Sequence, residues 1–178
     1  GRHRPAPALL PLGKGVVRAA LSANAQFGDK MPGYIVPTGI EYGDYFRYHS
    51  TALVTYGKAI NVTEFVKSHP VENEAQLFEP LKKELREGMA ELITFIKDDE
   101  NLGAKWELTK MLARKIKPSS CSLSARMQRN RQIVSSIEKA YENNPEATVE
   151  LLEKVKSFEK ARRKARLSIY SFGKKKSW

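Results

Sequence analysis

Residues 13–29, GKGVVRAALSANAQFGD, and residues 33–40, GYIVPTGI, decide the fold class that this sequence predicts. In the first stretch, apolar residues recur at helical spacing and Gly28 supplies a stop signal. In the second, residues 34–36 form a continuous apolar run, which is typical of a short buried strand, and Pro37 ends the ladder. A helix followed by a strand is typical of an α/β domain rather than of a helical bundle.

The next stretches add a second strand to this α/β pattern. Residues 41–50 read as a loop with its turn signal at Gly43. Residues 51–60, TALVTYGKAI, are rich in β-branched and aromatic side chains and predict a strand that closes at Gly57. From residue 63 onward the pattern becomes helical, so the strands are expected in the first third of the chain.

Two helices are predicted in the middle of the chain. Within residues 73–100, an apolar stripe at three- and four-residue steps consists of Leu77, Leu81, Leu85, Met89, Leu92 and Ile96. Asn73 is expected to cap this helix, and Pro80, which has no backbone N–H, predicts a kink or a late start. A shorter helix is expected over residues 101–118, where it ends at the final proline.

The last third of the chain predicts two long basic helices that form a hairpin. The apolar face of residues 124–142 consists of Met127, Ile133, Val134, Ile137 and Tyr141. Asn144 is a capping residue, and Pro145 fits the first position of the next helix, where its missing N–H costs nothing. The second helix runs into KARRKAR, residues 160–166, and its apolar positions are Leu151, Leu152, Val155 and Phe158. The two stripes are expected to pack on each other or on the α/β domain.

The formal charge of +11 is unevenly distributed and divides the chain in two. Residues 1–101 carry 12 Lys and Arg against 13 Asp and Glu, a net charge of −1, whereas residues 102–178 carry 19 against 7, a net charge of +12. We therefore expect a partial α/β domain with its following helix over residues 1–101, and a basic helical extension with a helical hairpin over residues 102–178. Such an excess indicates an anionic membrane surface or nucleic acid as partner, or a basic face that is only solvated.

Composition excludes several other classes. The single cysteine, Cys121, excludes an internal disulfide framework and fits a reducing compartment, and the three histidines have no metal-site spacing. No apolar run approaches the roughly 18 residues that cross a bilayer, and no secretory segment opens the chain. We therefore expect a cytoplasmic protein that lies peripherally on a membrane face. Cations interleaved with aromatic residues near the C-terminus favour the anionic membrane as partner, and no nucleic-acid-binding motif is found.

The opening residues carry a resemblance to a known family. GRHRPAPALLPLGKG, residues 1–15, and YIVPTGI, residues 34–40, are similar to the third and fourth sequence blocks of the glycerolipid acyltransferases, which comprise glycerol-3-phosphate and lysophosphatidic acid acyltransferases. VTYGKAINV, residues 54–62, looks like a later strand and loop of that family, with Ala59 where a proline is usual. The resemblance covers residues 1–62, and the order and spacing of its short pieces make it specific.

This resemblance implies a binding site for a phosphorylated acceptor. The residues that it assigns to substrate binding are Gly1, Arg2, His3, Arg4, Lys14, Val36 and Pro37. Fixed cations suit a phosphate and a glycine permits close approach, but His3 falls where the family has an arginine, so the clamp would pass to Arg2 or Arg4. Lys14 would bind at a helix N-terminus, which favours an anion, and the last two residues of the set would wall the pocket near the acyl or glycerol moiety. The plainer interpretation of these residues is a basic surface turn before an ordinary strand.

The same resemblance places the chemistry in an upstream His-x4-Asp block. There the histidine takes the proton of the acceptor hydroxyl, and the aspartate orients the imidazole. The present chain contains no such block: no histidine is followed at the fifth position by an aspartate, and only His69 is followed there by a carboxylate, Glu74. His69 comes after the strands instead of before the phosphate motif, so we do not expect it to be catalytic. No catalytic residue, metal ligand or cofactor is expected in the chain, and acyl-CoA or acyl carrier protein would be a co-substrate.

The function expected of the complete protein is O-acyl transfer in phospholipid synthesis. A fatty acyl group would pass from acyl-CoA or acyl carrier protein to a glycerol-phosphate acceptor, with lysophosphatidate favoured. This chain would be the C-terminal part of an acyltransferase-type α/β domain followed by a basic, mostly helical extension, and inactive alone. The alternative is a non-enzymatic helical module that binds anionic lipid or nucleic acid.

Overall fold

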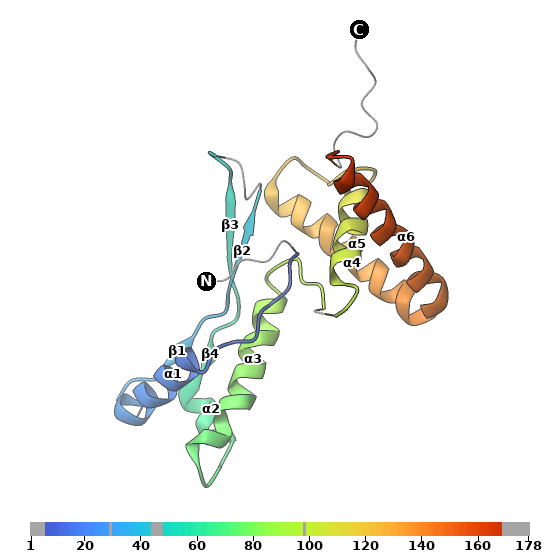
Figure 1. Cartoon of the computed structure of the whole chain (residues 1–178). Coiled ribbons are helices and arrows are strands. Elements are labelled where there is room, and N and C mark those ends of the chain that lie inside the picture. The colour runs from blue at the N-terminus through green and yellow to red at the C-terminus, as the bar shows by residue number, and fades with distance from the viewer. Residues whose placement is uncertain (1–5, 29, 44–47, 98, 169–178) are drawn as a thin grey trace. The chain divides into compact units, whose positions relative to one another are not determined.

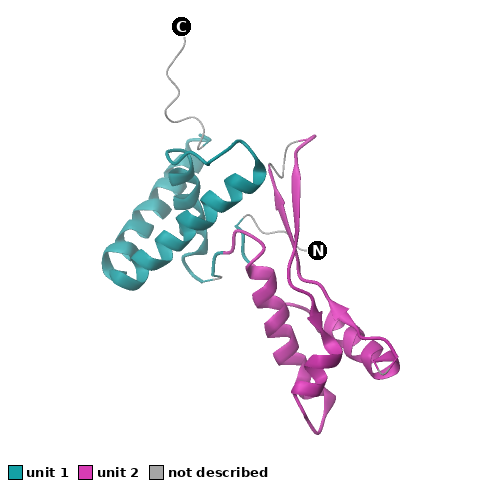
Figure 2. Ribbon diagram, turned by 180° about the vertical axis from the view of Figure 1, so that it is seen from behind, with its two compact units in different colours: residues 1–8, 96–178 teal, residues 9–95 magenta. Residues whose placement is uncertain are grey.

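A computed structural model presents the chain as two compact units (Figures 1 and 2). The sheet-containing unit spans residues 9–95, and the helical unit comprises the residues up to Ala8 and those from Ile96 onward. The residues described by the structure are 6–28, 30–43, 48–97 and 99–168. Helices are combined with short strands, which confirms the α/β class at the coarse level of mixed helix and sheet.

The sheet-containing unit combines three α-helices with two small sheets in its described residues. Its elements are α1 (Lys14–Phe27), β1 (Tyr34–Ile35), β2 (Thr38–Tyr42), β3 (Ala52–Tyr56), β4 (Ile60–Asn61), α2 (Val62–Ser68), the 3₁₀ helix η1 (Glu74–Leu77) and α3 (Phe78–Ala90). β1 pairs with β4 and β2 pairs with β3, both antiparallel, and in the second pair Ile40 lies opposite Val54. The described strands therefore form two separate antiparallel pairs and no parallel sheet.

Pro37 divides the predicted first strand into β1 and β2. The expectation of a continuously buried strand is wrong, because Tyr34 and Val36 are 57% and 47% exposed and only Ile35 between them is buried. The physical reason is that a two-stranded ribbon covers one face, so successive side chains alternate between core and solvent. The predicted loop also begins later than expected, because β2 continues to Tyr42.

The core of the sheet-containing unit unites α1, α2, α3 and the β1–β4 pair. Its buried residues are Val17, Leu21, Ile35, Ile60, Val62, Phe65, Leu77, Leu81 and Leu85. The predicted cap at Asn73 is confirmed, because its side chain accepts a hydrogen bond from the N–H of Ala75. The late start of the helix at Pro80 is also confirmed: η1 precedes α3, and the proline falls in the first turn of α3, where its missing N–H has no intrahelical partner to lose.

The helix predicted over residues 73–100 is too long, because α3 ends before Leu92 and Ile96. Leu92 lies against Gly39 of β2 so closely that a Cβ atom on this glycine would be 2.7 Å from the Cβ of Leu92. Two residues later, Thr94 donates two hydrogen bonds to the carboxylate of Glu41. Contacts with β2 therefore replace the last turns of the predicted helix, with Thr94 buried and Leu92 half-buried.

The helical unit consists of α4 (Leu102–Ala113), α5 (Leu123–Asn143) and α6 (Pro145–Lys164), and each helix packs against the other two (Figure 1). Their shared core contains Ala104, Leu108, Ile133, Ile137, Leu152 and Val155. The predicted hairpin of α5 and α6 is confirmed: Asn144 accepts a hydrogen bond from the N–H of Ala147, and Pro145 takes the first helical position. α4 is the third helix that covers this hairpin.

Two details of the helical prediction are wrong. α4 ends at Ala113, several residues before the predicted end at Pro118. Leu151 and Phe158 were expected on the buried face of α6 but are 45% and 37% exposed. The buried stripe of α6 is narrower than its apolar sequence, because neighbouring helices cover only one side of it. No helix in the described part of the chain is long and apolar enough to traverse a lipid bilayer.

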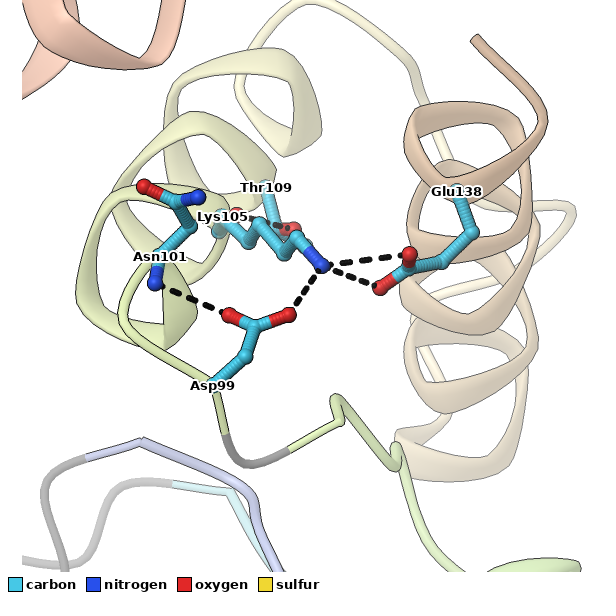
Figure 3. A network of polar contacts seen from close by, with 5 residues as sticks. All are labelled: Asp99, Asn101, Lys105, Thr109 and Glu138. Atoms are coloured by element: carbon cyan, nitrogen blue, oxygen red, sulfur yellow. Dashed lines mark hydrogen bonds and ion pairs between the residues drawn. The ribbon is translucent and has the colours of Figure 1, made fainter. Parts of the chain in front are cut away.

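A buried lysine fixes α4 against α5 (Figure 3). The side chain of Lys105 is 3% exposed, and its Nζ lies 2.8 Å from a carboxylate oxygen of Asp99 and 2.9 Å from one of Glu138. Burial opposes the charge of Lys105, but these hydrogen bonds outweigh it and hold the pKa of Lys105 above its ordinary value. Every charge of the cluster has a partner, which is the arrangement expected of a structural ion-pair network.

Candidate functional site

The first element of the proposed acceptor site is the N-terminus of α1, where the structure places Lys14. Gly13 takes the N-cap position without a side-chain cap, and the first turn contains no acidic residue. The free N–H groups and the helix dipole therefore favour an anion at this end. A Cβ atom on Gly13 or Gly15 would meet no other atom within 4 Å, so the backbone beside Lys14 is open.

The segment that leads into α1 is held by an arginine that sequence reasoning missed. Arg86 of α3 donates from Nη1 to the carbonyl of Leu10 at 3.0 Å and from Nη2 to the carbonyl of Leu9 at 3.1 Å. A guanidinium can bridge two successive carbonyls because its donors form a rigid planar fork. No local signal indicates this contact, because Arg86 lies in an ordinary run of charged helical residues.

The far end of α1 is tied to the strands and to α2. Thr63 donates from its hydroxyl to Oδ1 of Asn24 at 2.6 Å, and the N–H of Gly33 donates to the same hydroxyl at 3.4 Å. Asn61 caps α2 by accepting from the N–H groups of Thr63 and Glu64. These bonds fix α1 relative to the β1–β4 pair, so both ends of the helix have defined anchors.

Pro37 is buried at the point where residues 34–40 contact residues 54–62. Its carbonyl accepts a hydrogen bond from the N–H of Gly57 at 2.9 Å. A Cβ atom on Gly88 of α3 would lie 3.0 Å from Cγ of Pro37, so the proline ring lies directly on this helix. Val36 is 47% exposed. Of these two residues, Pro37 lines a groove beside α3 and Val36 does not.

This groove has a volume of about 610 Å³ and lies between α2, α3 and the turn that joins β3 to β4. Pro37, Phe65 and Leu92 supply apolar surface. Its acidic side chains are Glu64, Glu84, Glu87 and Glu91. Lys58 is the lysine or arginine that lines it, so four formal negative charges face one positive charge. A phosphate would be repelled here, and the groove is therefore not the predicted phosphate site.

His69 also lines the groove but has a structural role. Its Nδ1 lies 3.0 Å from the carbonyl of Phe65 and 3.0 Å from Oγ of Ser68, and its ring stacks on Phe65 at a centroid distance of 4.2 Å. The hydroxyl of Ser68 itself donates to the same carbonyl of Phe65. Both side chains thus contact the carbonyl of Phe65, which also accepts a hydrogen bond from the backbone N–H of His69 at the end of α2.

The described site residues lie at two positions along α3. A hydrogen bond from Lys82, with a weaker attraction from Lys14, lowers the pKa of Glu79 in the first turn of α3. Pro37 contacts Gly88, nine residues further, about 13 Å along the axis at roughly 1.5 Å per residue. The remaining predicted residues, Gly1, Arg2, His3 and Arg4, lie outside the described residues.

The comparisons give no family for this chain. Family models, curated proteins and solved structures were compared, and none matches it. Within the described residues, no group of three or more His, Cys, Asp or Glu side chains could hold a metal ion. A functional proposal therefore rests on the residues themselves and on their arrangement.

Proposed function

We propose that this chain is the C-terminal part of a glycerolipid acyltransferase-like domain, followed by a basic helical extension. The complete polypeptide transfers a fatty acyl group from acyl-CoA or acyl carrier protein to lysophosphatidate. The proposal rests on the order of three stretches within residues 1–62: the opening basic cluster, the strand ending in Val36-Pro37 and the later strand and loop. Each stretch is short, and their common order is what carries the resemblance.

The observation that supports this proposal best is the contact between two of these stretches. The hydrogen bond from Gly57 to Pro37 joins them, and the β1–β4 pair sets Ile35 opposite Ile60. Stretches that resemble successive blocks of one family thus form one local structure. α1 also begins at Lys14, at the position where the resemblance expects a lysine entering a helix.

In the proposed reaction, the acceptor hydroxyl attacks the thioester carbonyl and the thiol leaves. The histidine of an upstream His-x4-Asp block would take the hydroxyl proton and return it to the leaving thiolate. This chain would bind and orient the acceptor: Arg2, Arg4 and Lys14 neutralise its phosphate, and Pro37 lies near its glycerol or acyl part.

The nucleotide sequence upstream of the codon for Gly1 gives the first test. An in-frame Phe-Pro-Glu, with a His-x4-Asp block before it, is the expected result. The complete polypeptide should then release free thiol from acyl-CoA only when lysophosphatidate is added. An unrelated upstream sequence, or no acyl transfer by the complete polypeptide, would remove the enzymatic proposal in favour of a non-enzymatic lipid-binding module.

The acceptor site has its own test in the complete enzyme. Arg2→Ala combined with Arg4→Ala should raise the KM for lysophosphatidate at least tenfold, because each charge-assisted hydrogen bond contributes about 1.5–3 kcal/mol. The maximal rate should change less, because the upstream base is intact. Arg18→Ala removes an exposed cation from α1 and is the matched control. An unchanged KM in the double variant contradicts the assignment of these arginines.

A further inference from the structure

The topology of the helical unit brings three separate basic stretches to one end. Lys105 of α4 pairs with Glu138 of α5, and Glu107 of α4 pairs with Arg162 of α6. In Figure 1, α4 and α6 run in the same direction and α5 runs against them. The C-terminal ends of α4 and α6 and the N-terminal end of α5 therefore lie together, at the upper side of this unit in Figure 1. In the sequence, residues 114–122 separate α4 from α5, whereas the rest of α5 and most of α6 separate the N-terminal end of α5 from the C-terminal end of α6.

The two ends of this unit carry opposite charge. The basic end, residues 107–131 and 159–168, has 12 Lys and Arg against 2 Asp and Glu, a net charge of +10. The acidic end, residues 99–106 and 132–158, has 4 Lys and Arg against 7 Asp and Glu, a net charge of −3. A charge separation of this size orients the unit in the field of a charged surface.

The basic end has two carboxylates against its twelve lysines and arginines. Glu107 is buried and forms ion pairs with Lys110 and with Arg162. Glu159 pairs with Arg163 through an i,i+4 contact. The net positive charge of this end is therefore retained, and Lys115, Lys117 and Lys164 are among its exposed cations. Helix dipoles account for some cations at the C-terminal ends of α4 and α6, but they explain no apolar residue there.

Two exposed aliphatic side chains lie among these cations. Ile116 follows the end of α4 by three residues, and Leu167 follows the end of α6 by three residues. They are 46% and 44% exposed, and Lys115, Lys117 and the basic run before Leu167 flank them. An exposed aliphatic residue between cations is typical of a surface that inserts into the interface of an anionic bilayer.

The backbone at both aliphatic residues is fixed. The N–H of Ile116 donates to the carbonyl of Leu112 at 2.9 Å. The N–H of Leu167 donates to the carbonyl of Arg162 at 3.0 Å, and Nη1 of the same arginine donates back to the carbonyl of Leu167 at 2.9 Å. Because these bonds hold the chain at the helix ends, exposing the side chains requires no rearrangement, and little entropy is lost on insertion.

We propose that the basic end of the helical unit is a membrane-docking surface for anionic phospholipid headgroups. The cations contact lipid phosphates, Ile116 and Leu167 enter the boundary between headgroups and acyl chains, and the acidic end points away from the bilayer. Aliphatic side chains favour this partner over nucleic acid, which would use aromatic side chains to stack on bases. The surface is independent of acyl transfer, so either proposal can fail alone.

The test compares the whole chain with two charge-matched triple variants. Binding is measured by co-sedimentation with vesicles of phosphatidylcholine, with and without added phosphatidylglycerol. Replacing Lys115, Lys117 and Lys164 by Gln should weaken binding to the anionic vesicles about a hundredfold, because each lysine near such a surface contributes roughly fivefold. The control replaces three lysines of the acidic end by Gln, namely Lys139, Lys154 and Lys156, and should bind like the parent chain.

A second pair of variants separates the membrane from nucleic acid. Ile116→Ser and Leu167→Ser should weaken vesicle binding, most clearly at high salt, where charge attraction is screened. Both side chains are exposed, so thermal unfolding should be unchanged. Equal weakening by the two triple variants, or unchanged binding of both serine variants, overturns the proposal. Tighter binding to a single-stranded oligonucleotide than to anionic vesicles overturns it in favour of a nucleic-acid surface.

Discussion

Glu41 and Thr94 close the hairpin onto the chain that follows α3. One carboxylate oxygen of Glu41 lies 3.2 Å from the backbone N of Thr94, and the other lies 3.1 Å from its hydroxyl. Thr94 is fully buried, so both of its donors depend on this carboxylate for a partner. The contact joins residues 53 positions apart in sequence and lies four residues beyond the end of α3.

Replacing Glu41 should destabilise the sheet-containing unit. Glu41→Ala leaves two donors of Thr94 without their partner, and we expect a loss of about 1–3 kcal/mol in the free energy of unfolding. Glu41→Gln keeps one acceptor oxygen and should lose less. Chemical denaturation gives the measurement, with Glu72→Ala at an exposed position as the control. Equal stability of Glu41→Ala and the control would show that the contact contributes nothing.

Replacing either of two glycines by alanine should change the stability of the chain, in opposite directions at the two positions. At Gly39 the new Cβ would lie 2.7 Å from Cβ and 2.8 Å from the carbonyl oxygen of Leu92, so Gly39→Ala should destabilise by about 1–3 kcal/mol. At Gly15 of α1 the new Cβ meets nothing within 4 Å, and Gly15→Ala should stabilise the helix by about 0.5–1 kcal/mol. Urea denaturation of both variants measures this. A stabilising Gly39→Ala would mean that Leu92 does not pack on β2.

The Lys105 network should give stability that depends on pH at both extremes. Lys105→Met removes the buried charge and leaves Asp99 and Glu138 without their partner, and we expect a loss of about 3 kcal/mol near neutral pH. Burial raises the pKa of Asp99, but hydrogen bonds from Lys105 and Asn101 lower it further than burial raises it. A lowered folded pKa adds stability above the unfolded value near 3.9, and this stability is lost as the pH falls through the folded pKa.

For Lys105 the pKa shift has the opposite direction, so its contribution to stability depends on pH in the opposite sense. A raised folded pKa adds stability that is complete below the unfolded value near 10.4 and is lost as the pH rises through the folded pKa. The difference in unfolding free energy between the parent chain and Lys105→Met should therefore be flat around neutrality, and should decrease below about pH 4 and above about pH 10.5. Denaturation across this pH range measures it. A difference that stays constant into acid would contradict the role of Asp99.

Arg86 should hold the segment that leads to the proposed acceptor site. Arg86→Lys cannot bridge the carbonyls of Leu9 and Leu10 with one ammonium group, so amide hydrogen exchange in residues 9–13 should become faster. Lys83→Ala changes an exposed cation on the same helix and is the matched control. The helical unit should exchange at its usual rate in both variants. Unchanged exchange in residues 9–13 would show that the segment is held by other contacts.

Local signals in the sequence predicted most of the elements correctly. Asn73 and Asn144 act as the caps that their neighbours indicate, and Pro145 begins a helix, because capping and proline chemistry depend on a few adjacent residues. The hairpin of α5 and α6 followed from two apolar stripes with a short break. For the candidate site, the residue types and their order are read from the sequence, and the predicted position of Lys14 at the start of a helix is confirmed.

The sequence by itself determined the mixed class of the fold, the caps and the basic excess of the last 77 residues. Tertiary structure alone decided that α3 ends before Leu92, that Pro37 meets Gly57, and that the cations of α4, α5 and α6 gather at one end. The physical reason is the distance along the chain over which each kind of interaction acts. Caps and periodicity act between neighbours in the chain, whereas a buried carboxylate, a bridging guanidinium or a polarised charge distribution depends on which distant segments pack together.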